Sequence, residues 1–344
     1  MILDSLGMFD AAAAAPERMN IAIAQTKAVL AKADLPPHDE IANVVLAGVG
    51  TSGHAGSLLL EAVGPTIAVP LVVHRGYGVP HFVDESTLVI AMSFTGNTAE
   101  VVDAVTEAVD DGATVVCIGG DGELAAIAQR ENLTSINVPE APAARAAIDS
   151  LLVPALLTLD HLGFYPGGDE WIRLAQQQVE QRRNALIAEN NPARALARRI
   201  GRALPIVYGG NGPGGAVASF WKSQFNTNAK VAAFANQVPE LTHNEIVGWG
   251  TNGDVTRQVF QAILLRHEFE HPSVAARIDL VEEILVEVVG EVYSVEAQGE
   301  GLLAQMMDLL LFGTFVSLNV AVETDVDPGP IAIVDEIAER IGES

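Results

Sequence analysis

The feature that most constrains the fold is a pattern of strand, glycine-rich loop and helix that occurs twice in the chain. The apolar run at 41–47 leads into the loop GVGTSGHAGS, and a helix is predicted over 55–62. About 162 residues later, the apolar run at 204–208 leads into the loop GGNGPGG and a second helix over 216–224. This match indicates an internal duplication of one α/β unit.

Further apolar runs of buried-strand type alternate with helical stretches in both halves of the chain. The other predicted strands are 67–75, 87–93, 113–120, 258–265 and 292–295. The clearest other helical patterns cover 17–33, 100–110, 170–189, 272–289 and 301–323. Near-continuous apolar strands that alternate with helices are typical of a parallel sheet covered on both faces. We therefore predict an α/β fold with two doubly wound parallel-sheet domains, 1–155 and 201–344, and a helical connection over 156–200.

The charge balance excludes whole classes of partner. The chain has 19 Lys and Arg residues against 44 Asp and Glu residues, which gives a formal net charge of -25. A surface this negative repels phosphate backbones and anionic lipid headgroups, so we expect neither nucleic acid nor a membrane as a partner. Only four of the basic residues are lysine, and the acids are spread along the chain. This composition fits a halophilic protein in molar salt, and an ordinary acidic protein with a skewed base composition is the alternative.

The cysteine content and the apolar runs bear on where the protein works. Cys117 is the only cysteine, so we expect no internal disulfide, no multi-cysteine metal site and a reducing compartment. The first residues carry no early basic cluster of the kind that begins a secretory signal. The longest apolar run, 309–322, has 14 residues, fewer than the ~20 needed to span a bilayer, and is predicted as a buried helix. A cytoplasmic location is therefore expected.

Two loops at predicted strand ends hold the residues best suited to bind an anion. In a parallel sheet, ligands bind where the carboxyl ends of strands and the N-termini of helices converge. After the first strand, Gly50 allows a close backbone approach, and the following helix aims its amide groups outward. The loop SFTGNT places the hydroxyls of Ser93, Thr95 and Thr98 just before a helix, where they can converge on one phosphate. A tight turn for the first loop and an ordinary N-cap at Thr98 are the structural alternatives.

At these loops the chain resembles the sugar isomerase (SIS) domain family, whose phosphosugar loop has the form S-x-S-G-x-T. In the second half, QFNTNAK at 224–230 and PELTHNE at 239–245 resemble the segments Q-x-N-E-N-A-K and P-E-L-N-H-N-E of bifunctional phosphoglucose/phosphomannose isomerases. The segment VDPGP and the residues after it resemble that family's closing segment and helix. The resemblance implies two SIS domains with an additional C-terminal helix, and no cofactor or metal. It also implies aldose/ketose isomerisation of hexose 6-phosphates through a cis-enediol.

The resemblance further implies roles for individual residues. Ser52 and Gly50, together with the hydroxyls of SFTGNT, would hold the 6-phosphate of a phosphosugar substrate. Arg145 corresponds to a family arginine that stabilises the enediolate, and a cation suits the negative charge that develops on oxygen. His243 corresponds to the histidine that helps to open the sugar ring. The alternatives are a surface arginine at a helix start and a structural histidine.

Three positions differ from the pattern of that family. Thr227 stands where the family has its base glutamate, and a threonine cannot abstract a carbon-bound proton without a base of its own. The family's C-terminal threonine and lysine fall on Gly329 and Glu336 in an ungapped placement. The residues expected to bind phosphate are therefore kept, whereas three of the expected catalytic positions are changed.

These departures leave three possible functions open. In the first, the protein is a phosphosugar isomerase with a relocated base, for which Glu240 and Glu245 are the nearest candidates because they flank His243. In the second, it is a catalytically weak or inactive protein that binds a phosphosugar as a sensor or regulator. An amidotransferase or deaminase acting on amino sugars ranks last, since an amidotransferase needs an N-terminal cysteine nucleophile. The resemblance also implies a homodimer in which His243 approaches the other subunit's cleft, and the apolar segment 231–238 agrees with this.

Overall fold

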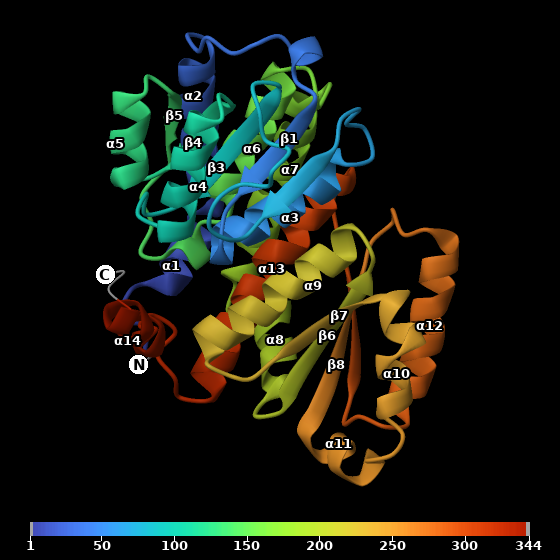
Figure 1. The fold of residues 1–344 in the computed structure, drawn as a ribbon. Helices are drawn as coiled ribbons and strands as arrows, with labels where there is room; N and C mark the ends of the chain where they lie inside the picture. Colours follow the sequence, from blue (N-terminus) through green and yellow to red (C-terminus); the bar gives the residue numbers. More distant parts are fainter. Residues whose placement is uncertain (1–2, 342–344) are drawn as a thin grey trace. The chain divides into compact units, whose positions relative to one another are not determined.

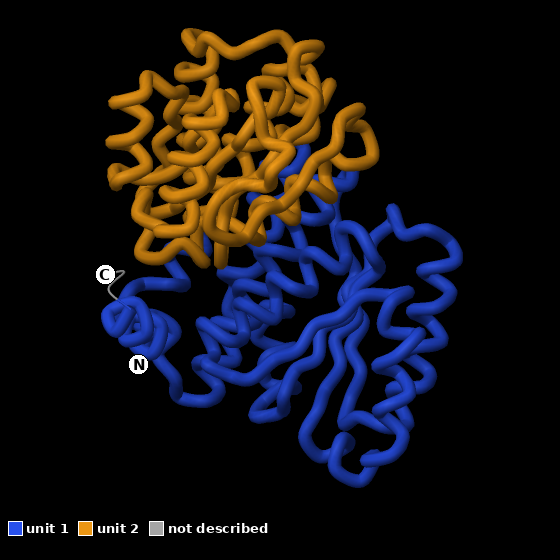
Figure 2. Tube along the Cα trace, viewed as in Figure 1, with its two compact units in different colours: residues 1–13, 174–342, 344 blue, residues 14–173, 343 orange. Residues whose placement is uncertain are grey.

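The computed structural model describes residues 3–341, which form two compact units (Figure 2). One of them, the N-terminal unit, consists of residues 14–173. The other, the C-terminal unit, combines residues 174–341 with 3–13, so the start of the chain belongs with its second half. The domain limits expected from the sequence, 1–155 and 201–344 with a connection over 156–200, stay a prediction.

The N-terminal unit is built on a five-stranded sheet whose strands all run parallel, in the order β2-β1-β3-β4-β5 (Figure 1). The strands are β1 (Asn43–Ala47), β2 (Leu71–His74), β3 (Thr87–Ser93), β4 (Thr114–Gly119) and β5 (Thr134–Asn137). The first four lie within apolar runs predicted as strands. The sequence pattern misses β5, because this edge strand is short and largely polar and only Ile136 is fully buried.

Helices cover both faces of this sheet. They are α2 (Ala15–Leu30), α3 (Gly50–Val63), α4 (Ala99–Asp110), α5 (Glu123–Arg130) and α6 (Asp149–His161), with short turns η1 (His38–Glu40) and η2 (Ala144–Ala146). α4 and α5 pack on the face that presents Val45, Val89 and Val115. On the other face α3 comes close to Leu46 and Val73, and α6 packs against α3 and α2. The doubly wound arrangement predicted for this half is confirmed.

The C-terminal unit contains a four-stranded parallel sheet in the order β7-β6-β8-β9. Its strands are β6 (Leu204–Gly210), β7 (Phe234–Val238), β8 (Phe260–Arg266) and β9 (Val292–Glu296). In chain order this arrangement repeats β2-β1-β3-β4 of the first sheet, as the duplicated glycine loops predict. β7 is not expected from the sequence, because it is an edge strand in which Phe234 is half-exposed and only Val238 is fully buried.

The helices of this unit flank the second sheet in the same way. They are α1 (Met8–Ala13), α7 (Gly168–Leu186, which begins in the N-terminal unit), α8 (Pro192–Ile200), α9 (Pro213–Gln224), α10 (Glu245–Gly248), α11 (Gly253–Val259), α12 (Pro272–Val286), α13 (Leu302–Glu323) and α14 (Ala332–Ile341). A π-helical turn η3 (Phe225–Ala229) extends α9, and η4 (Glu240–His243) follows β7. α12 packs on one face through Ile278 and Val281, whereas α9 and α13 lie on the other (Figure 1).

α13 is the central helix of the C-terminal unit and is buried along almost its whole length. It is long and apolar enough to cross a membrane by length and composition, but 94% of the qualifying window is buried inside the protein. The buried Asp308 carboxylate accepts a 2.6 Å hydrogen bond from Arg182 Nε and another from Gln178 Nε2, also at 2.6 Å. Because this charge is paired, α13 can carry it inside the core, and the predicted buried helix is confirmed.

The packing of α13 against α9 makes a stability prediction at Gly313. A β-carbon at this position would lie 2.2 Å from Nε1 of the buried Trp221, which donates a 2.9 Å hydrogen bond to the Leu309 carbonyl. We expect Gly313→Ala to destabilise the protein by about 1–3 kcal/mol, since the indole has to move. Gly250→Ala is the matched control, because its β-carbon would meet no atom within 4 Å. Thermal unfolding followed by circular dichroism measures both, and a melting temperature for Gly313→Ala at or above wild type contradicts the packing.

Candidate functional site

The N-terminal sheet has a topological switch point between β1 and β3. These strands are neighbours, but the chain leaves β1 toward β2 on one side and later returns to β3 on the other. The loops after β1 and β3 therefore lie next to each other at the carboxyl edge, where α/β proteins bind their ligands. One loop leads into α3 and the other into α4. Both loops predicted to bind phosphate are found at this switch point.

The first turn of α3 offers backbone donors without acceptors. Val49 occupies the N-cap position, and its apolar side chain cannot cap the helix. Within residues 3–341, the amide groups of Gly50, Thr51 and Ser52 have no hydrogen-bond acceptor. Ser52 is only 5% exposed, and its hydroxyl also has no partner in this part of the chain. These donors lie at the positive end of the helix dipole, which suits an anion.

The loop before α4 arranges three hydroxyls around the start of that helix. Ser93 Oγ lies 2.8 Å from Thr98 Oγ1 and accepts a 3.3 Å hydrogen bond from the Thr98 amide. Thr95 is exposed, and its Oγ1 accepts from the Asn97 amide at 3.2 Å. Thr98 is the N-cap residue, but its side chain makes no capping bond to the helix. The N-cap alternative is therefore right about the position of Thr98 and wrong about what its hydroxyl does.

Two other residues of this loop, Gly96 and Asn97, hold its shape. Asn97 Oδ1 accepts a 2.9 Å hydrogen bond from the Glu123 amide, and the Gly96 carbonyl accepts one of 2.8 Å from the Leu124 amide. These bonds cap α5 from a loop more than twenty residues earlier. Gly96 has φ of 76°, and a β-carbon there would lie 2.6 Å from the Gly120 carbonyl oxygen. The glycine and asparagine of SFTGNT are thus structural, and sequence reasoning did not find this role.

Arg145 lies in η2 and is 7% exposed. The alternative of a surface arginine is therefore wrong. The turn η2 contacts α3, the helix that carries Gly50 and Ser52. The N-terminal unit thus brings the predicted arginine segment and the predicted phosphate loops to one end of its sheet.

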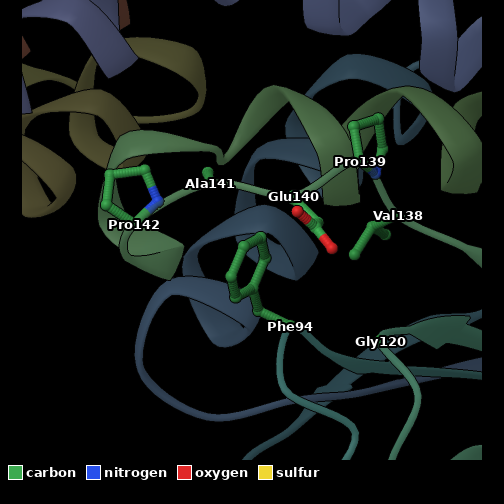
Figure 3. A pocket seen from close by; sticks show the side chains of 7 residues that line it. All are labelled: Phe94, Gly120, Val138, Pro139, Glu140, Ala141 and Pro142. Carbon is green, nitrogen blue, oxygen red and sulfur yellow. The ribbon is translucent and has the colours of Figure 1, made fainter.

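A pocket of about 520 Å³ opens beside the hydroxyl loop (Figure 3). It is lined at the ends of β3, β4 and β5 by Phe94, Gly120, Val138, Pro139, Glu140, Ala141 and Pro142. Figure 3 shows that the ring of Phe94 and the carboxylate of Glu140 point into the same space. Phe94 stands between two of the three hydroxyl residues, so this pocket adjoins the anion site. The sequence contains no local signal for it, because its walls come from three separate loops.

The second sheet has the same switch point with different chemistry. By strand register, Ala91 pairs with Ala47 and Leu265 pairs with Gly209, so His267 occupies the place that corresponds to Ser93. His267 is buried, and its Nδ1 accepts a 3.2 Å hydrogen bond from the Phe269 amide. Burial lowers the pKa of His267 below its ordinary value, although Glu270 opposes this shift. A neutral imidazole rather than a set of hydroxyls therefore occupies this edge of the second sheet.

The predicted catalytic residues His243 and Glu240 lie in the C-terminal unit, at the two ends of η4. Both are exposed, and the His243 ring has no partner within residues 3–341. Glu240 Oε1 accepts a 2.8 Å hydrogen bond from Asn244 Nδ2. Its other carboxylate oxygen has no partner among the described residues. The alternative of a packed structural histidine does not fit the exposed His243.

Glu245, the other candidate base, is held by neighbours on both oxygens. One oxygen accepts a hydrogen bond from the Tyr208 hydroxyl, and Oε2 accepts one from Asn236 Nδ2 at 2.6 Å. Burial and the Glu245 carboxylate together keep the pKa of Tyr208 well above its usual range. Trp249 Nε1 donates to the same hydroxyl at 3.2 Å. This network joins β6, β7 and α10, so Glu245 has a structural task that its sequence position did not indicate.

The three positions that depart from the family pattern have ordinary local roles. Thr227 lies in the π-helical turn, and its Oγ1 donates to the Ser223 carbonyl at 2.8 Å. The Gly329 amide donates to Asp327 Oδ1 at 2.9 Å, and Glu336 pairs with Arg340 on exposed α14. None of these interactions points to proton transfer.

Two observations on the described residues concern metal-ligating side chains and the cysteine thiol. Between residues 3 and 341, no three His, Cys, Asp or Glu side chains are grouped so that they could hold a metal ion. Cys117 lies inside β4, and burial raises the pKa of its thiol to about 12. A thiol held protonated in this way is a poor nucleophile, which disfavours the amidotransferase alternative.

Comparison with known proteins places both halves of the chain in related families. Residues 40–160 match the SIS domain family. Residues 189–341 match the family described as the bacterial phospho-glucose isomerase C-terminal SIS domain. The duplicated α/β unit inferred from the glycine loops thus corresponds to two SIS domains.

Similar proteins extend over most of the chain. The chain is 31% identical over 309 residues to a bifunctional phosphoglucose/phosphomannose isomerase from Caldicellulosiruptor bescii, covering 89% of this chain and 91% of that protein. It is also 31% identical over 305 residues to the protein of the same description from Thermoplasma acidophilum, covering 87% and 89%. The C-terminal domain of glucosamine-fructose-6-phosphate aminotransferase from Francisella tularensis superposes with a TM-score of 0.72 at 15% identity, covering 95% and 98%. The last similarity shows the fold alone.

The trans cap of α5 predicts a stability effect at Asn97. Asn97→Ala leaves the Glu123 amide without its acceptor, and we expect it to destabilise the protein by about 1 kcal/mol. Asn211→Ala is the control, because the exposed Asn211 side chain has no partner in the part of the chain that the structure describes. Chemical denaturation measures the difference, and equal midpoints for the two variants contradict the cap.

Proposed function

Because the chain belongs to the SIS-domain family, in the group of the bifunctional phosphoglucose/phosphomannose isomerases, we propose that it isomerises aldose and ketose 6-phosphates. The observation that carries the proposal is the pair of uncapped helix N-termini at the switch point, with the Ser52 and Ser93 hydroxyls beside them. Backbone amides, hydroxyls and two helix dipoles together suit a phosphate dianion. The substrates proposed are glucose 6-phosphate, mannose 6-phosphate and fructose 6-phosphate.

The reaction that we propose moves one proton between C1 and C2 of the open-chain sugar through a cis-enediol. Arg145 would stabilise the negative charge that develops on oxygen, and His243 would move protons during ring opening. Of the two candidate bases, Glu240 is favoured, since one of its oxygens has no partner among residues 3–341 whereas both oxygens of Glu245 accept hydrogen bonds. The pocket beside Phe94 gives the sugar room next to the phosphate loops.

A phosphosugar sensor is the second candidate function, and it rests on specific observations. Thr227 is bonded to a backbone carbonyl, and Glu245 is part of a structural network. Neither residue is placed to act as a base, while the phosphate loops are intact. A sensor would keep the binding site and lack turnover.

Three properties of the protein in solution also belong to this proposal. Its family resemblance supports a homodimer in which His243 completes the other subunit's site. Its charge of -25 supports a requirement for molar salt. Its single cysteine supports a reducing, cytoplasmic location.

Phosphate binding is tested at Thr95, an exposed residue of the hydroxyl loop. Wild-type protein with fructose 6-phosphate at 100 times its Kd should be stabilised by about 2.7 kcal/mol, measured as a shift in thermal unfolding. Thr95→Glu should abolish this shift, because it places a carboxylate against the phosphate. Thr106→Glu, at an exposed position in the middle of α4, is the control and should bind like wild type. Binding by Thr95→Glu equal to that of wild type contradicts the assignment of the loop.

Catalysis is tested by turnover of fructose 6-phosphate to glucose 6-phosphate in about molar KCl. We expect wild type to be active and Glu240→Gln to lower kcat by about 10²–10⁴-fold, the usual contribution of a general base. Glu283→Gln on the exposed side of α12 is the control for charge loss.

The outcomes separate the candidates. Loss of activity in Glu245→Gln alone assigns the base to Glu245 instead. Wild type that binds phosphosugar but shows no turnover supports the sensor, and activity gained in Thr227→Glu then shows that the lost base is the cause.

A further inference from the structure

A positively charged side chain, Arg75, lies at the C-terminal end of β2, outside the two switch-point loops. Arg75 follows β2 directly, and its Nη2 donates to the Gly53 carbonyl at 2.8 Å and to Ser57 Oγ at 2.6 Å. Both acceptors lie in the first two turns of α3. A β-carbon on Gly53 would be 3.0 Å from Arg75 Nε, so the glycine gives the guanidinium room to approach. Arg75 is therefore held against the start of α3.

The remaining donors of this guanidinium are unused. Nε and Nη1 of Arg75 have no partner within residues 3–341, and no carboxylate of this range forms an ion pair with it. This is unexpected in a chain with 44 acidic residues and 19 basic ones. Nε lies against Gly53 on the same edge as Nη2, so the two N–H groups of Nη1 are the ones available to a ligand.

The Arg75 side chain is exposed, and its charge lies close to the positive end of the α3 dipole. A cation near a helix N-terminus is repelled by the positive end of the dipole. Arg75 is bound to Gly53, three residues after the helix begins, which places it within about one helical turn of the free amides of α3. Ser52, next to Gly53, is only 5% exposed, and its hydroxyl has no partner within residues 3–341. The cation, the dipole and this hydroxyl all favour the same negatively charged ligand.

We propose that Arg75 is a further phosphate-binding residue, which contacts the substrate's phosphate through the two N–H groups of Nη1 while Nη2 holds it on α3. This inference rests on the proposed function, because it takes the phosphosugar as the ligand. Arginine suits the role since its planar fork can bind α3 and the phosphate at once. Sequence reasoning missed Arg75 because it follows β2, one strand away from the loops that carry the motif.

The test compares binding of fructose 6-phosphate and of inorganic phosphate to the whole chain by calorimetry. Arg75→Met should weaken both by about 10–100-fold, the usual effect of losing a charge-assisted hydrogen bond. Arg75→Lys keeps the charge without the fork and should fall between Arg75→Met and wild type. Wild-type affinity for fructose 6-phosphate should also rise as the second proton of this phosphate monoester, with a pKa of about 6, is lost. This rise should be smaller in Arg75→Met.

Ser57→Ala separates anion binding from a purely structural role. It removes one of the two hydrogen bonds that hold Arg75 on α3 but keeps the cation. If Arg75 only fastens α3, Ser57→Ala and Arg75→Met should weaken binding alike and leave the pH profile unchanged, which overturns the proposal. If Arg75 binds phosphate, Ser57→Ala should stay within a few-fold of wild type. Circular dichroism confirms that each variant is folded, and Arg75→Lys replaces Arg75→Met should the latter not fold.

Failure of this inference is distinguishable from failure of the proposed function. Unchanged affinity in Arg75→Met, with binding lost in Thr95→Glu, removes Arg75 from the site and leaves the phosphosugar site in place. Absence of phosphosugar binding by wild type removes both.

Discussion

The parallel direction of every strand is the constraint on which the rest of this structure depends. Parallel neighbours cannot be joined by a tight turn, so each connection has to cross a face of the sheet, and here most do so through a helix. All strand carboxyl ends then lie at one edge, together with the N-termini of the helices that follow them. In each sheet the order places the first and third strands next to each other, which creates one switch point per unit. The fold thus provides two equivalent places for a site.

Side chains decide that the two places differ. In the N-terminal unit, the switch point has Ser93 and two uncapped helices, α3 and α4. In the C-terminal unit, His267 lies at the equivalent place and is buried as a neutral imidazole. The loop SFTGNT also divides its residues between two tasks, because Gly96 and Asn97 cap α5 while the hydroxyl residues remain near α4. Rigid support and ligand donors therefore come from the same six residues.

The C-terminal unit shows why a candidate base cannot be chosen from its place in the sequence alone. Glu240 lies three residues before His243 and Glu245 two residues after it, and both are carboxylates. The fold brings Tyr208 and Asn236 onto Glu245, whereas one oxygen of Glu240 has no partner in the described part of the chain. Both oxygens of Glu245 are occupied by protein donors, so this carboxylate holds β7 and α10 to β6. The difference between the two arises from strand pairing between β6 and β7.

The sequence by itself determined the parallel α/β architecture, the duplication and the position of the hydroxyl loop. These depend on local patterns: apolar runs, glycine loops after strands, and residue types within a few positions of Ser93. Only the tertiary structure decided that β5 and β7 complete the sheets, that Asn97 caps a distant helix, and that Arg75 lies on α3. Polar edge strands and hydrogen bonds between distant residues leave no periodic signal, because their partners are chosen by the order of the strands rather than by adjacency along the chain.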